Sequence, residues 1–184
     1  MPISWTRLAL LNSFSMISIP ERLLINGREP VQEFDPAEKL YFRFQVNYFS
    51  GSESRIPVAA IKFPDFSVNR ELFSAPSDVL IPHWLKWGIV EIREGGVPKS
   101  LPVSQQGKAA ARTVDFQTIH DPIGVEHEYF PQPTQQFENY AHCEIRAFES
   151  GERLTQDIPK SVKKLFRTKL SDSSDLCQIL LDAL

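Results

Sequence analysis

Cysteine is scarce in this sequence, since Cys143 and Cys177 are the two examples among 184 residues. Two cysteines are too few for a disulfide framework in a chain of this length, and they are typical of buried thiols in a reducing compartment. We therefore expect a cytoplasmic protein.

Long hydrophobic runs are also lacking. The apolar stretch at residues 8–19 is too short to span a bilayer and is interrupted by Asn12 and several serines. No A-x-A cleavage pattern precedes Pro20. We expect neither a membrane span nor a signal peptide from this segment.

Neither sign of charge is in large excess, because the formal net charge is −3 and the isoelectric point is near 5.8. This balance excludes nucleic-acid binding by the overall charge of the molecule, so any such binding must be local. No P-loop, dinucleotide fingerprint or G-x-S-x-G elbow is present, and no cofactor is predicted.

Phenylalanine, by contrast, is abundant, with thirteen copies in a sequence that is 42% hydrophobic. Aromatic side chains fit a pleated sheet better than the flank of a helix, which favours a sheet-rich core. A chain of this length buries roughly 70% of its unfolded surface, enough for one filled core. We predict a single domain over residues 1–184.

Hydrophobic periodicity divides the chain into strands followed by helices, the order typical of an α+β fold with a largely antiparallel sheet. We expect about five strands, with the C-terminal helices packed on the sheet. The expected strands cover residues 41–48, 58–63, 88–93, 113–119 and 139–148. We predict surface loops at residues 94–111 and 123–138, and helical structure over residues 157–184 with a break at residues 171–175.

A basic run follows residue 159, and its members are Lys160, Lys163, Lys164, Arg167 and Lys169. Five cations within ten residues could bind several phosphates of a nucleic acid. They equally suit the solvated face of an amphipathic helix, where basic residues toward the C-terminus complement the helix dipole. Both interpretations remain open.

Three polar blocks do not fit a simple solvated face: residues 67–70 (SVNR), 120–122 (HDP) and 139–145 (NYAHCEI). Over residues 43–148 the chain resembles a group of small bacterial proteins that share an S-V-x-R block, a D-P turn and an A-H-x-x-I strand. That group has no settled activity, so the resemblance implies no catalytic assignment. The long insertion at residues 123–138 departs from the group's compact spacing.

The blocks permit a catalytic hypothesis. If their strands pair, His120 and His142 form a general acid and base, and Arg70 holds a phosphate or carboxylate. The candidate binding residues around them are Ser67, Asn69, Asp121, Asn139, Tyr140 and Glu144, with Lys160, Lys163, Lys164 and Arg167 on the basic run.

The structural alternative gives the same residues ordinary roles. His120 and Asp121 then form a turn, His142 binds a backbone carbonyl, and Arg70 pairs with Glu144. His120, Asp121, His142 and Glu144 are also metal-ligand types, but the P-C-x-x-C partner of zinc deaminases is missing, and no metal is predicted.

Two functions follow from this sequence. The first is a non-catalytic accessory or interaction module of a bacterial cytoplasmic system, which docks onto a protein partner through the region around Trp84 and Trp87 and through its terminal helices. The alternative is a small enzyme acting on a phosphodiester, nucleotide or nucleic acid. The enzyme requires Arg70, His120 and His142 to share one cavity.

Overall fold

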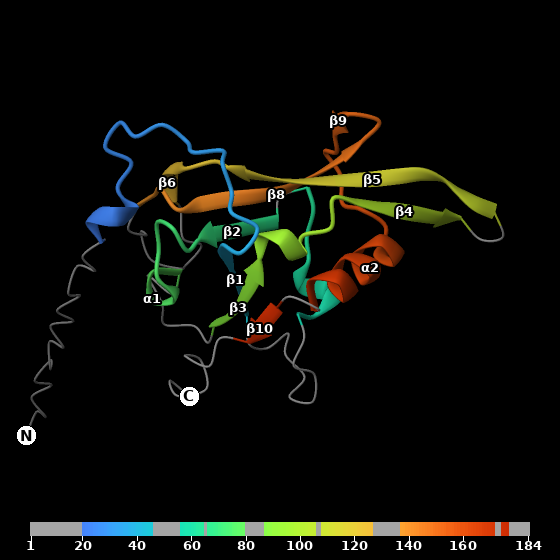
Figure 1. The fold of residues 1–184 in the computed structure, drawn as a ribbon, viewed down its shortest axis with the longest axis horizontal. Helices are drawn as coiled ribbons and strands as arrows, with labels where there is room; N and C mark the ends of the chain where they lie inside the picture. The colour runs from blue at the N-terminus through green and yellow to red at the C-terminus, as the bar shows by residue number, and fades with distance from the viewer. Residues whose placement is uncertain are drawn as a thin grey trace, which may run out of the picture.

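The computed structural model describes residues 20–45, 56–64, 66–79, 87–105, 108–126, 137–171 and 174–176. Within these ranges an antiparallel sheet of eight strands dominates the fold (Figure 1). Its order is β10 (Ser174–Leu176), β3 (Trp87–Arg93), β1 (Lys39–Gln45), β2 (Phe66–Arg70), β8 (His142–Glu149), β5 (Lys108–His120) and β4 (Ser100–Gln105), and β9 (Glu152–Arg153) also pairs with β8. A separate pair of strands is formed by β6 (Ile123–Glu126) and β7 (Phe137–Asn139).

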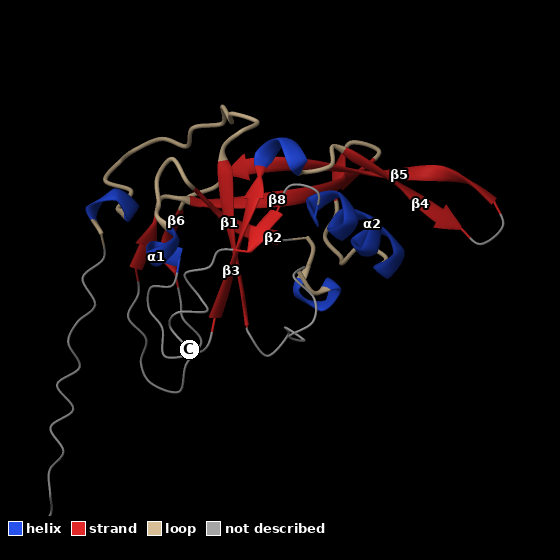
Figure 2. Cartoon of the chain, turned by 60° about the horizontal axis from the view of Figure 1, so that its bottom comes forward, coloured by secondary structure: helices blue, strands red, loops and turns tan. Residues whose placement is uncertain are grey.

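Helices are short or peripheral in the described ranges. The longest is α2 (Lys160–Ser171), which lies against β4 and one side of the sheet (Figure 2). The others are α1 (Pro76–Val79) and the 3-10 turns η1 (Glu21–Leu23), η3 (Val58–Ala60) and η4 (Glu94–Gly96). None of these helices is long and apolar enough to cross a membrane.

Phenylalanines from four segments fill the space between the sheet and α2. The ring of Phe166 on α2 lies 5.3 Å from Phe63, 5.8 Å from Phe66 and 4.8 Å from Phe116, measured between ring centroids. Edge-to-face and tilted pairs at these distances stabilise a core beyond their buried area. The abundance of phenylalanine therefore does correspond to a sheet-rich core.

The predicted α+β class with a mainly antiparallel sheet is confirmed, but the strand count is higher than predicted. The loop predicted at residues 94–111 is wrong for most of its length. Residues 94–111 contain η4, all of β4 and the start of β5, and β4 and β5 form an antiparallel hairpin. Of the loop predicted at residues 123–138, the described ends belong to β6 and β7, and residues 127–136 lie outside the described residues.

Two further elements differ from prediction. The strand expected at residues 58–63 is replaced at Val58–Ala60 by η3, which follows the extended Pro57. Strand β10, which pairs with β3, covers the end of the break predicted at residues 171–175 and the first residue of the predicted second helix, Leu176. The rest of that predicted helix, residues 177–184, lies outside the described residues. In its described part, the C-terminal segment thus contributes one helix and one sheet edge.

A segment without regular structure joins η1 to the sheet. Asn26 and Gly27 turn the chain with φ angles of 46° and 73°, the left-handed values that suit an Asn-Gly pair. Residues 29–38, which we call the strap, then pass outside the sheet and lead into β1 (Figure 1). The strap brings backbone groups to the ends of β2 and β5.

Candidate functional site

Arg70 ends strand β2, and its side chain is 1% exposed. Its guanidinium binds both carboxylate oxygens of Glu38, from Nε at 2.8 Å and from Nη2 at 2.7 Å. It also donates to the strap carbonyls of Val31 at 2.6 Å and Glu33 at 2.7 Å. The guanidinium carbon lies 4.0 Å from the ring centroid of Phe34. Arg70 therefore fastens the strap to the sheet.

His120 ends strand β5 and is also 1% exposed. The Val31 N–H donates to its Nδ1 at 2.8 Å, so Nε2 carries the ring proton and donates to the Tyr140 carbonyl at 2.5 Å. The ring stacks on Phe73, with 5.1 Å between centroids. Burial lowers the pKa of His120 below its usual 6.5, and the nearby charge of Arg70 lowers it further.

The two residues predicted as an anion clamp and a proton carrier therefore hold the same strap. Gln32 adds to this contact, because its amide donates to the His120 carbonyl at 2.8 Å and accepts from the His120 N–H at 3.2 Å. Tyr140, a predicted binding residue, donates its hydroxyl to the strap carbonyl of Glu29 at 2.8 Å. These bonds occupy the groups that a ligand would need.

His142 lies on the opposite face of the sheet. His120 pairs in register with Cys143, and successive residues of β8 point to opposite faces, which separates the two histidines. His142 is 6% exposed, and its Nδ1 lies 2.7 Å from the Asp121 carbonyl. A carbonyl can only accept, so Nδ1 carries a proton, and in the neutral ring Nε2 keeps a lone pair.

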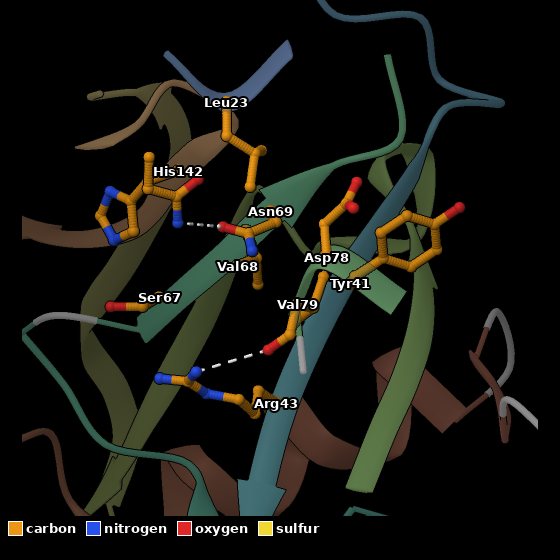
Figure 3. A pocket seen from close by; sticks show the side chains of 10 residues that line it. Leu23, Tyr41, Arg43, Ser67, Val68, Asn69, Asp78, Val79 and His142 are labelled. Carbon is orange, nitrogen blue, oxygen red and sulfur yellow. Dashed lines mark hydrogen bonds between the residues drawn. The ribbon is translucent and has the colours of Figure 1, made fainter. Parts of the chain in front are cut away.

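His142 lines a small pocket over strands β1, β2 and β8 (Figure 3). The pocket has a volume of about 50 Å³. Three of the predicted binding residues, Ser67, Asn69 and Asn139, line it as well, and the Asn139 amide donates to Asn69 Oδ1 at 3.1 Å. Of the three predicted catalytic residues, His142 alone lines this pocket.

Two further predicted binding residues, Asp121 and Glu144, belong to an ion-pair network around Arg146 on β8. Arg146 binds the carboxylates of both Asp121 and Glu144, and Arg153 reaches Glu144 at 3.3 Å. The expected Arg70–Glu144 pair is therefore wrong in its partner, since Arg70 binds Glu38. The expected contact of His142 with a backbone carbonyl is present.

Four residues of the basic run, Lys160, Lys163, Lys164 and Arg167, share one side of α2, and Lys169 lies on another side. Lys163 binds the carboxylate of Asp157, and Arg167 is partly buried. Lys160, Lys164 and Lys169 are exposed, and none of the three pairs with a carboxylate among the described residues. Leu165, between them, is 40% exposed. Lys160 and Lys164 lie one turn apart on this helix, and Leu165 and Lys169 lie one turn apart in a neighbouring row. We call the exposed surface formed by these two rows the basic face.

Two sequence predictions concern other side chains. Trp84 lies outside the described residues, and Trp87 begins β3 with a side chain that is likewise not described. Cys143 is fully buried, and burial raises the pKa of its thiol, in keeping with a structural rather than a nucleophilic cysteine.

Three pocket residues with polar or charged side chains were not singled out from the sequence. Tyr41 and Arg43 come from β1, and Asp78 comes from α1. The signal for the first two is the alternation of β1, which places them on the face opposite Phe42 and Phe44. Asp78 has no comparable signal, because its position depends on how α1 folds back onto the sheet.

Comparison with protein-family models, with curated proteins and with solved structures finds no match to this chain. The resemblance noted over residues 43–148 therefore stays a prediction, and a function must be argued from the chain's own residues.

Proposed function

We propose that this chain is a non-catalytic interaction module of the bacterial cytoplasm, which docks onto an acidic surface of a protein partner through the basic face of α2. The observation that carries the proposal is the exposed Leu165, which has Lys169 one helical turn further along and Lys164 next to it in the chain. An apolar anchor surrounded by charged groups is the usual anatomy of a protein interface, in which a dry centre is enclosed by a polar rim.

The position of the basic face supports this proposal. Val162, Phe166 and Leu170 on the opposite side of α2 are fully buried, so the core fixes the orientation of the helix. Lys160 and Lys164 are one helical turn apart and point the same way. The chain as a whole carries a net charge of −3, which makes this cationic surface a local feature that steers acidic partners.

The alternative function, chemistry on a phosphodiester by paired histidines, is not the one that we propose. It requires Arg70 and His120 at a ligand, and their polar groups are bound to the strap, Glu38 and Tyr140. The volume of the pocket that His142 lines is also far below the roughly 300–1,000 Å³ of pockets that enclose whole small molecules.

A photo-crosslinking amino acid at position 165 tests the docking surface. We expect an adduct with a specific protein when the native host lysate is irradiated, because Leu165 would be covered by the partner. The matched control places the same amino acid at position 72, since Leu72 is 61% exposed in the turn after β2 and lies outside the basic face. This control should give no such adduct.

Charge variants decide what the adduct means. Lys160→Glu combined with Lys164→Glu should abolish it, as should salt at about 1 M, where the Debye length falls to about 3 Å. Arg93→Glu, a reversal at an exposed position on β3, should retain it. An adduct that survives the lysine reversals contradicts the proposal, and an adduct lost after nuclease treatment indicates a nucleic-acid partner instead.

A further inference from the structure

The pocket on the face opposite the core is built from two rows of side chains that cross three neighbouring strands. Tyr41 on β1, Asn69 on β2 and His142 on β8 are directly in register. Ser67 on β2, two residues from Asn69, forms the next row with Arg43, two residues from Tyr41. Figure 3 shows His142, Ser67 and the Arg43 guanidinium along one side of the pocket.

The charge of the lining favours an anion. The carboxylate of Asp78 receives two bonds from Arg22, at 2.7 and 2.6 Å, and a third from the Ala75 N–H at 2.6 Å. With its oxygens engaged, Asp78 is a poor ligand for a cation. Arg43 brings a full positive charge to the lining, and its Nη1 donates to the Val79 carbonyl at 3.4 Å.

Hydrogen-bond donors also face this pocket. Because the Asn69 Oδ1 accepts from Asn139, the Asn69 amide nitrogen is turned away from that bond. Ser67 is exposed and carries a hydroxyl that can donate. Donors on the two neighbouring strands β1 and β2 thus border the space.

The size of the pocket restricts the ligand to a small group. A water needs roughly 10–15 Å³ of such volume, so about 50 Å³ holds a few waters or one compact anionic group. A tetrahedral phosphate offers acceptors in several directions, whereas a planar carboxylate offers two oxygens in one plane. We propose that this pocket binds a phosphate group, held by Arg43, Ser67 and Asn69 beside the ring of His142, independently of the basic face of α2.

Titration of the protein with inorganic phosphate at constant ionic strength and neutral pH tests the site. We expect saturable shifts of the His142 ring signals and a rise in melting temperature. Arg43→Gln should weaken binding about tenfold or more, because a charge-assisted hydrogen bond is lost. Arg93→Gln, on the neighbouring strand, should bind like the wild type.

Further arms keep the proposal falsifiable if Arg43→Gln does not fold. Ser67→Ala alters an exposed hydroxyl and should fold normally while binding phosphate more weakly. A phosphoserine peptide and AMP are titrated in the same way. If either shifts the same signals with a higher affinity than inorganic phosphate, the result supports the site and identifies the source of the phosphate group. The proposal is overturned if phosphate binding to the wild type does not saturate, or if Arg43→Gln and Ser67→Ala both bind phosphate as tightly as the wild type. It is also overturned if the wild type binds acetate as tightly as phosphate.

Discussion

Replacing Arg70 with methionine is expected to lower the free energy of unfolding by about 3–5 kcal/mol, the usual effect of removing one partner from a buried ion pair. Methionine keeps the unbranched stem and its packing. It leaves the Glu38 carboxylate and the carbonyls of Val31 and Glu33 without the donor that they share. Urea unfolding monitored by circular dichroism measures the loss.

An exposed ion pair supplies the matched control. Arg112 also binds both oxygens of a carboxylate, that of Glu149, but the side chain of Arg112 is 57% exposed. Arg112→Met should therefore have a much smaller effect than Arg70→Met, because water solvates the groups left behind. Adding Glu38→Gln to Arg70→Met should recover part of the loss. A loss below about 1 kcal/mol in Arg70→Met would show that the strap is not held by this residue.

The second large effect is expected from His120→Phe. Phenylalanine can keep the stacking on Phe73, but it leaves the Val31 N–H and the Tyr140 carbonyl without their ring partner. Two buried groups without partners cost about 2–4 kcal/mol together. Faster amide exchange at Val31 than in the wild type should accompany the loss, because the strap loosens.

The same residue predicts a dependence of stability on pH. The pKa of His120 is lowered in the folded chain, so below about 6.5 the unfolded chain binds a proton that the folded chain does not. Its contribution is therefore complete above pH 6.5 and declines as the pH falls toward the folded pKa. The wild type should lose stability over this range more steeply than His120→Phe. Parallel curves for the two proteins would contradict the assigned role.

The alternation of polar and apolar residues contained more information about the site than the three polar blocks suggested. In β2, Phe66, Val68 and Arg70 share the buried face, and in β5, Phe116 and His120 do the same. Period-two alternation thus assigns Arg70 and His120 to the core face. His142 alternates onto the other face of its own strand, and this difference was readable before the strands were paired.

Strand β4 could not be predicted because its sequence carries turn residues. Pro98 and Pro102 suggested a loop, yet β4 lies at one edge of the sheet order, where a missing N–H need not interrupt the ladder. Edge positions depend on the partners of a strand and not on its own composition. The strand content was underestimated for this reason.

The partners of Arg70 and His120 were also beyond prediction. Four of them are backbone groups, the N–H and carbonyl of Val31 and the carbonyls of Glu33 and Tyr140, and a carbonyl or N–H has no signature in sequence. Residues 29–38 have no helical or strand period that would place them against the sheet. A buried cation predicts that a partner exists, while its identity depends on the path of the strap.

The structural role of His120 and the pocket position of His142 both depend on the hydrogen bonds of their imidazole rings, and these bonds fix which ring nitrogen carries a proton. A two-bond proton–nitrogen correlation spectrum of the histidine rings at neutral pH tests it most directly, with the His120→Phe variant providing the assignment. We expect His120 to carry its proton on Nε2 and His142 to carry one on Nδ1. A His120 ring protonated on Nδ1 would contradict the account, because it could not accept the bond from Val31.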